Sequence, residues 1–104
     1  MLRINVEFRK GVLFVRLDGK IENNDYLESI NNLIEKIGIN YIVLNIENIE
    51  YVDVNSLKQI IEYNKKILKK NKHLLICDKN KNRNKIFKNS IPNINCEIDA
   101  FSLI

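Results

Sequence analysis

The side chains that could take part in catalysis are few in this 104-residue chain. The single histidine, His73, opens an apolar segment after a lysine-rich turn, which is typical of a residue at the edge of a strand. General-base catalysis needs a base beside a nucleophile or paired carboxylates. Asp18, Glu22 and Asp25 are close in sequence, but they surround a predicted turn and helix start, where acidic residues commonly act as caps. We therefore predict that the chain is not an enzyme.

The sequence also contains no recognisable motif for binding a cofactor or a metal ion. Cys77 and Cys96 match no metal or redox spacing, and Cys77 lies in an apolar segment as a small hydrophobic residue would. We expect both thiols to be reduced in a chain without an export signal. The glycines at positions 11, 19 and 38 stand alone, so no glycine-rich phosphate loop is present. The prediction is no metal site and no cofactor.

The net charge of +4 conceals an uneven distribution along the chain. Residues 1–57 carry a net −3, residues 58–88 carry +9, and residues 89–104 carry −2. A block this basic suggests nucleic-acid binding, but readers of bases need exposed aromatic side chains among the charges. Residues 58–88 offer only Tyr63 and Phe87, and Phe87 is predicted to be in the core. We favour a solvated helix face and keep nucleic-acid binding as an alternative.

Length and hydropathy indicate one domain spanning residues 1–104. An apolar content of 45% in 104 residues suffices for a hydrophobic core without disulfides or metals. No run of 18 apolar residues exists, so we expect no membrane insertion. The N-terminus alternates apolar and polar residues and lacks the continuous apolar stretch of a signal peptide. The predicted location is the cytoplasm, and the predicted state is a monomer or a weak dimer.

Five segments have the pattern of β-strands. Alternation in residues 2–9 predicts a half-buried strand whose apolar side is Leu2, Ile4, Val6 and Phe8. A Lys-Gly pair then separates it from a second apolar run, which predicts an antiparallel hairpin. The predicted strands are residues 2–9, 12–17, 41–46, 73–77 and a short edge strand at 94–98.

Helical spacing appears between these strands. Apolar residues recur with a helical period from Leu27 to Ile37, with Asn24 or Asp25 as the cap and Gly38 closing the end. A second helix follows Asp53 and continues to Leu68. Residues 79–89 predict a weak helix with Ile86 and Phe87 inward, and Asp99 is expected to cap a terminal turn containing Phe101, Leu103 and Ile104.

The alternation of helices and strands predicts an α/β fold. Helices that join successive strands imply parallel pairing through right-handed crossovers, and the initial hairpin adds an antiparallel member. We therefore expect a mixed, mostly parallel sheet of four to five strands.

Residues 41–57, YIVLNIENIEYVDVNSL, combine a buried strand, a short loop with the apolar pair Ile49 and Val52, and an aspartate that opens a helix. This arrangement resembles the central motif of STAS domains of the anti-sigma factor antagonist type. The similarity continues through Ile60-Ile61 and residues 74–77, and upstream through residues 12–22. It implies one STAS-like domain with its helices mainly on one face of the sheet.

The resemblance also implies a function in bacterial transcription regulation. In this family the helix after the aspartate docks onto an anti-sigma factor, which is a kinase of the histidine-kinase-like ATPase type. The kinase phosphorylates a Ser or Thr directly after the aspartate, and the added charge releases the complex. The family pattern Asp-Ser/Thr-Ser-Gly-Leu-Gly reads here as Asp53-Val54-Asn55-Ser56-Leu57-Lys58.

The phosphorylation site is therefore degenerate. Val54 stands at the acceptor position and has no hydroxyl, so it cannot be phosphorylated, and Ser56 is the only displaced candidate. Ser56 and Lys58 replace two glycines of the pattern, and the acidic turn residue of the family corresponds to Glu22. The predicted partner-binding residues are Glu22, Asn23, Asn24, Asp53, Val54, Asn55, Ser56, Leu57 and Lys58.

Besides nucleic-acid binding, two further alternatives to an anti-sigma factor antagonist remain. The first is structural: Asp53 is an ordinary N-cap that accepts from the amide of Asn55 or Ser56, and Leu57 is a core residue. The second concerns the partner, because stand-alone STAS proteins also resemble accessory subunits of ABC-type lipid transport systems. Loss of the phosphorylated residue would have no cost in such a role.

Overall fold

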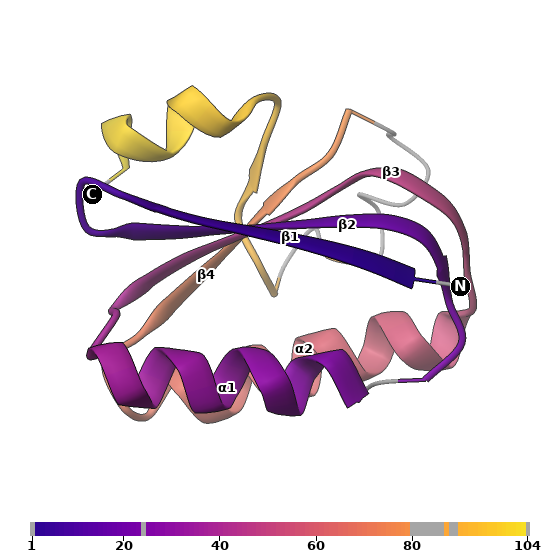
Figure 1. Ribbon diagram of the computed structural model, residues 1–104, viewed down its shortest axis with the longest axis horizontal. Helices are drawn as coiled ribbons and strands as arrows, with labels where there is room; N and C mark the ends of the chain where they lie inside the picture. Colours follow the sequence, from indigo (N-terminus) through magenta and orange to yellow (C-terminus); the bar gives the residue numbers. More distant parts are fainter. Residues whose placement is uncertain (1, 24, 80–86, 88–89, 104) are drawn as a thin grey trace.

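The computed structural model describes residues 2–23, 25–79, 87 and 90–103 (Figure 1). Three predictions fall at least partly outside these residues. They are the capping and binding roles of Asn24, most of the helix at 79–89, and the place of Ile104. Within the segment 79–89, Phe87 is described and is fully buried, as predicted.

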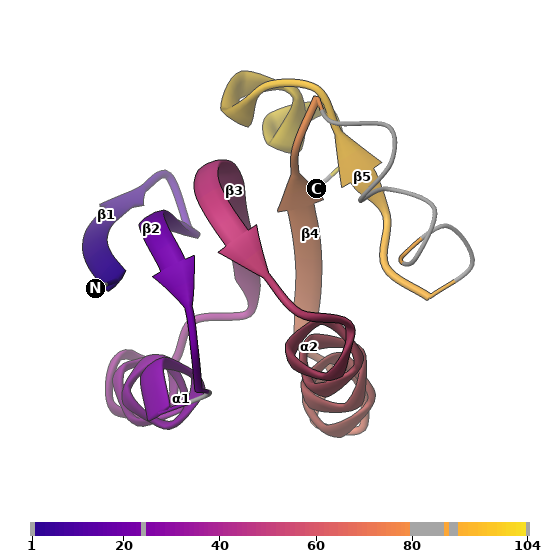
Figure 2. The same cartoon turned by 90° about the vertical axis from the view of Figure 1, so that its right-hand side faces the viewer.

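A five-stranded mixed sheet forms the centre of the molecule (Figure 2). The strands follow one another across it in chain order, and only the first pair is antiparallel. The predicted architecture is thereby confirmed. The strands are β1 (Leu2–Arg9), β2 (Val12–Ile21), β3 (Tyr41–Val52), β4 (His73–Cys77) and β5 (Asn93–Ile94).

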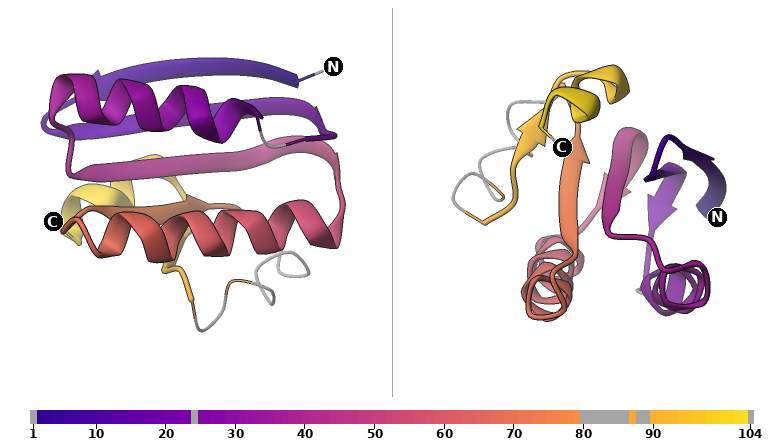
Figure 3. Two further views of the ribbon diagram at one scale, coloured as in Figure 1. Left: turned by 90° about the horizontal axis from the view of Figure 1, so that it is seen from below. Right: turned by 90° about the vertical axis from the view of Figure 1, so that its left-hand side faces the viewer.

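Two helices cover one face of this sheet, and a short 3-10 helix lies on the other (Figures 2 and 3). They are α1 (Asp25–Ile37), α2 (Val54–Leu68) and η1 (Glu97–Ser102). A larger apolar cluster joins the sheet to α1 and α2, and a smaller cluster on the opposite face includes Phe14, Val43, Cys77 and Ala100. Most of the burial therefore fixes the two long helices against the strands.

Two turns take the backbone conformation that their sequence predicts. Lys10 and Gly11 have φ of +49° and +84°, the positive pair that defines a two-residue type I′ hairpin loop. Gly38 has φ +76° directly after α1, a conformation that a glycine adopts without steric cost.

Strand lengths are where the predictions were least accurate. β3 was expected to end at Ile46, with Ile49 and Val52 in a loop, yet it continues to Val52. β2 likewise extends beyond Leu17 to Ile21 and stays paired with β3 through two register irregularities. Such irregularities displace the alternation of buried residues, so the period-two signal is interrupted although the ladder continues.

The C-terminal segment also differs from its prediction. β5 occupies Asn93–Ile94 instead of 94–98, because η1 begins at Glu97. Cys96 is the N-cap of η1, and Asp99 lies inside the 3-10 turn instead of capping it.

The outer sides of β1 and α1 are more exposed than predicted. Ile4, Val6 and Phe8 were expected to be the buried side of β1, but their exposed fractions are 43%, 42% and 51%. Ile37 at the end of α1 is 49% exposed, whereas Tyr26 in the first turn is buried. The cause is position, since β1 is at the end of the strand order and its helix-side face is only partly covered.

Candidate functional site

Parallel pairing brings the two predicted binding segments to the same edge of the sheet. Ile21 at the end of β2 pairs with Val52 at the end of β3. The next residues, Glu22 and Asp53, therefore leave adjacent strands at their carboxyl ends, the edge where open α/β sheets commonly bind ligands. Asn23 follows on the same turn and accepts a hydrogen bond of 3.1 Å from the amide of Asp25 at the start of α1.

Asp53 is the N-cap of α2. Its backbone is extended, with φ −81° and ψ 165°, and its Oδ1 accepts a hydrogen bond of 2.7 Å from the Ser56 amide. Hydrogen bonds from the Ser56 backbone and side chain lower the pKa of the Asp53 carboxyl below its ordinary value. The structural role predicted for Asp53 is thus confirmed, with Ser56 as the donor.

The side chains in the first turn of α2 differ widely in their exposure to solvent. Val54 is 57% exposed, while Ser56 and Leu57 are each 3% exposed. Leu57 is a core residue, as predicted. Of the remaining predicted contacts in this turn, Asn55 and Lys58 are exposed. The position that carries a hydroxyl in the family pattern therefore faces solvent here as an isopropyl group.

Tyr51 is a further exposed side chain close to this turn in sequence, and the residue pattern did not predict it. Its side chain is 56% exposed at the end of β3, three positions before Val54. The tyrosine was hidden because this part of β3 was predicted to be a loop. A polar hollow of about 260 Å³ lies at the same edge of the sheet, and it is lined by Arg3, Gly19, Lys20, Glu22 and Glu50. Exposed apolar side chains and charged groups at one edge are a composition that protein interfaces commonly have.

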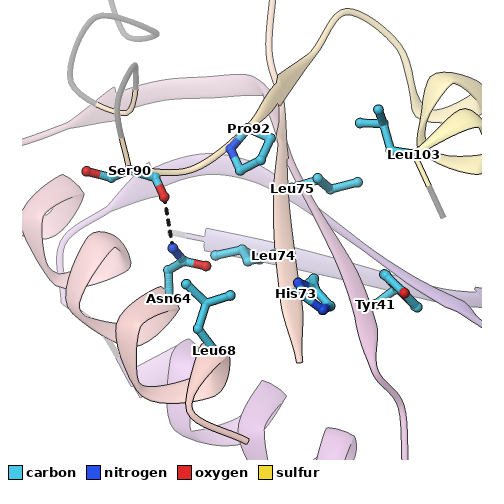
Figure 4. A pocket seen from close by; sticks show the side chains of 9 residues that line it. All are labelled: Tyr41, Asn64, Leu68, His73, Leu74, Leu75, Ser90, Pro92 and Leu103. Carbon is cyan, nitrogen blue, oxygen red and sulfur yellow. Dashed lines mark hydrogen bonds between the residues drawn. The ribbon is translucent and has the colours of Figure 1, made fainter. Parts of the chain in front are cut away.

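An apolar hollow of about 350 Å³ opens at the other end of the strands (Figure 4). It lies where β3 and β4 begin, far along β3 from Asp53, and the His73 ring stacks on Tyr41 with 5.3 Å between centroids. Asn64 points its amide nitrogen at the Ser90 carbonyl oxygen, 3.0 Å away. His73 is thus the first residue of strand β4, at the end of the strand, as predicted. The lining residues are Tyr41, Asn64, Leu68, His73, Leu74, Leu75, Ser90, Pro92 and Leu103.

Several lysines of the basic block are engaged within the protein. Lys70 Nζ lies 2.9 Å from a Glu35 carboxylate oxygen, and Lys65 Nζ lies 3.5 Å from Glu62. Lys72 donates a hydrogen bond of 2.6 Å to the carbonyl of Ile39. For residues 58–72 of this block, these contacts support the interpretation as a helix face and a turn.

The thiols and acidic groups do not assemble a metal site in the described part of the chain. Both cysteines are free, Cys77 is buried, and Cys96 is half-buried. Burial raises the pKa of the Cys77 thiol to about 12, which keeps it protonated and unreactive. Within the described ranges, no three His, Cys, Asp or Glu side chains gather closely enough to hold an ion.

The geometry defines a small mixed sheet with two helices on one face and a capped helix start beside the end of a parallel strand. Consistent with this, the model of the STAS domain family matches residues 3–92. The chain belongs to the STAS domain family.

One relative and two solved structures that resemble the chain are named as anti-sigma factor antagonists. The chain is 30% identical over 82 residues to the anti-sigma F factor antagonist of Paenibacillus polymyxa, covering 76% of this chain and 70% of that protein. The structure of the anti-sigma factor antagonist SpoIIAA in its unphosphorylated form has the same fold, with a TM-score of 0.77, 14% identity, and coverage of 98% of this chain and 100% of that one. An anti-sigma factor antagonist from Mycobacterium paratuberculosis matches with a TM-score of 0.82, 16% identity, and coverage of 100% and 94%.

Among the described helices, none combines the length and apolar character needed to cross a bilayer.

Proposed function

We propose that this STAS domain binds an anti-sigma factor through the surface formed by Glu22, Asn23, Tyr51, Asp53, Val54, Asn55 and Lys58, and that phosphorylation at residue 54 does not control this binding. Ser56 and Leu57, which the sequence also placed in this surface, are buried and are left out of it. The relatives named as anti-sigma factor antagonists support the class of partner. The absence of control by phosphorylation at residue 54 is supported by one observation. Val54, which has no hydroxyl, is exposed directly after the N-cap Asp53. The partner belongs to the histidine-kinase-like ATPase type, and the complex forms in the cytoplasm without enzymatic activity of this chain.

The physical argument begins with the charge of a phosphate. A phosphoryl group adds about two negative charges, which disrupt an apolar interface through desolvation and repulsion. Val54 cannot accept that group, and its exposed isopropyl presents apolar area at the start of α2. Binding at this surface is therefore constitutive with respect to residue 54.

Ser56 offers no replacement for the lost acceptor. Its side chain is 3% exposed, and its amide donates to Asp53. A kinase needs an acceptor oxygen that reaches its active site, whereas the Ser56 side chain is buried and its hydroxyl hydrogen-bonds to Asp53. The geometry therefore favours a domain without a phosphorylation switch in this turn.

The test measures both the affinity for the partner and the mass of the intact protein. The chain is mixed with an anti-sigma factor kinase from the same organism and with ATP, and the affinity is measured before and after incubation. We expect a complex of unchanged affinity and a protein of unchanged mass. A phosphate located within residues 53–58, or the absence of any complex, would contradict the proposal. Val54→Ser is the matched variant, because it restores the hydroxyl and should gain phosphate and lose affinity.

One alternative keeps the same surface but changes the partner. The lost acceptor is equally compatible with an accessory subunit of an ABC-type lipid transport system, where no phosphate release is needed. Affinity purification from the native cell distinguishes the two roles. Recovery of a transport ATPase instead of an anti-sigma factor would assign the surface to transport. In the described part of the basic block, the internal contacts of Lys65, Lys70 and Lys72 count against nucleic-acid binding by those three side chains.

A further inference from the structure

The outer edge of β1 has hydrogen-bonding groups directed away from the sheet. β1 is at the end of the described strand order and its other edge pairs with β2 (Figures 2 and 3). The two-residue loop makes Arg9 and Val12 a hydrogen-bonded pair, and the antiparallel pattern repeats this at every second residue. The amides and carbonyls of the even-numbered residues, Leu2 to Phe8, therefore point outward.

The same even-numbered residues carry an exposed apolar stripe. Ile4, Val6 and Phe8 are 43%, 42% and 51% exposed, and they share the helix-side face with their partners on β2. Natural edge strands are commonly protected by lysine, proline or a bulge, and this stripe contains none of them. An open ladder with an apolar face is suited to pairing with another strand.

α1 extends this apolar surface at the hairpin end. Asn31 accepts a hydrogen bond from Tyr63 on α2, and Glu35 accepts one from Lys70 just after α2. That side of α1 therefore faces α2. Helical spacing places Ile37 on the other side of α1, where it is 49% exposed. The apolar stripe and Ile37 thus lie on the side of the domain away from α2.

We propose that β1 pairs with β1 of a second copy of this chain, antiparallel about a two-fold axis at Asn5, to form one continuous sheet across the dimer. The carrying observation is self-complementarity of charge. Arg3 and Glu7 lie two positions on either side of Asn5, so each Arg3 faces Glu7 of the second copy. Cross-strand pairs of opposite charge are stabilising, and like charges in this position are destabilising.

Other registers lose this complementarity. A two-fold axis at Val6 sets Arg3 opposite Arg9, and an axis at Glu7 sets two glutamates opposite each other. An axis at Ile4 leaves Phe8 unpaired beyond the end of the ladder. The axis at Asn5 alone among these sets Leu2 opposite Phe8 and Ile4 opposite Val6, which covers the apolar stripe along its whole length.

Arg3 and Glu7 remain available for such pairing. The Arg3 side chain is 76% exposed while its Nη2 lies 3.2 Å from Asp18. The Glu7 side chain is 40% exposed, and its two carboxylate oxygens contact Arg16 at 3.0 Å and Arg9 at 3.4 Å. A guanidinium and a carboxylate each have further hydrogen-bonding positions, so the contacts within one copy extend into a network across the axis.

Disulfide trapping tests both the dimer and its register. Cysteine is placed singly at positions 5, 6 and 7 in a Cys96→Ser background, with buried Cys77 retained, and dimers are separated without reductant after mild oxidation. With the axis at Asn5, the two copies of Asn5→Cys face each other in a non-hydrogen-bonded pair with Cα atoms about 4.5 Å apart, within disulfide range. The copies of Val6→Cys and Glu7→Cys are offset along the strand by about 7 and 14 Å, which is too far.

The expected result is fast cross-linking of Asn5→Cys alone, together with a solution mass that rises towards the dimer with concentration. Val6→Lys should raise the concentration needed for association at least about tenfold, because it introduces like charges on the paired edge. Asn32→Lys on the exposed face of α1 is its control and should leave association unchanged. A monomer at every concentration, or preferred cross-linking at position 6 or 7, overturns the proposal. Circular dichroism confirms that each variant is folded.

Discussion

Arg16 on β2 and Glu97 on η1 are joined by two hydrogen bonds of 2.8 Å, although 81 positions separate them in the chain. Asn45, which pairs with Arg16 in the neighbouring strand, donates a third bond of 2.9 Å to Glu97. This carboxylate fixes η1 to the face of the sheet opposite the two helices. η1 lies beyond residue 92, where the family match ends.

Replacing the Glu97 carboxylate should loosen η1. We expect Glu97→Gln to lower the free energy of unfolding by about 1–2 kcal/mol, because the half-buried guanidinium of Arg16 loses one of its two charged acceptors and keeps only Glu7. Urea unfolding followed by circular dichroism measures the change. Asp99→Asn removes an equivalent charge from an exposed position of the same 3-10 helix and should have little effect. Equal losses in the two variants would show that the pairing with Arg16 is not the cause.

The same ion pair predicts a dependence of stability on pH. Hydrogen bonding to Arg16 holds the pKa of Glu97 below its ordinary value. Its contribution is therefore fully present above the pKa of an unfolded glutamate, about 4.3, and is lost as the pH falls through the lower pKa of the folded state. The stability difference between wild type and Glu97→Gln should accordingly shrink below about pH 4. A difference that stays constant at lower pH would contradict this linkage.

Local patterns predicted the elements better than their lengths. The Asp53 cap and the Lys10-Gly11 hairpin depend on a few adjacent residues, so the sequence was sufficient for both. The continuation of β3 to Val52 depends on its ladder with β2, which contains register irregularities that break the alternation. The burial of a side chain in β1 depends on which strand is outermost, and alternation alone cannot specify that.

At the candidate site too, some features depend on local sequence and others on long-range pairing. The role of Asp53 and the missing hydroxyl at residue 54 are properties of the residue types. The adjacency of Glu22 and Asp53 follows from the pairing of Ile21 with Val52, which is a long-range contact. Tyr51 was missed for the same reason, since its exposed position exists only because β3 continues through it.

The N-cap gives a test that separates hydrogen bonding from charge. Asp53→Ala removes the acceptor for the Ser56 amide, and we expect the midpoint of thermal unfolding to fall by about 4–8 °C. Asp53→Asn keeps a side-chain oxygen in the same place and should lose much less. If both variants lost equally, the charge of the carboxylate and not its hydrogen bond would be the stabilising feature.

The two thiols should differ strongly in reactivity. Cys77 is fully buried and its pKa is raised to about 12, whereas Cys96 is half-buried at the N-cap of η1. At about pH 8 we expect one thiol of the native protein to react rapidly with a disulfide reagent and the second to react only after unfolding. Cys96→Ser should abolish the fast phase. A fast phase that persists in this variant would show that Cys77 becomes accessible in the native state.

Charge at residue 54 should weaken partner binding without weakening the fold. Val54→Glu places a carboxylate at the first helical position, where the helix dipole favours negative charge, and the exposed side chain leaves no cavity behind. At an apolar interface the same carboxylate must lose its water, so we expect the affinity for the anti-sigma factor to fall at least about tenfold. Asn32→Glu introduces the same charge on the exposed face of α1 and should bind normally. Calorimetric titration of both variants measures the difference, and equal affinities would move the binding surface away from Val54.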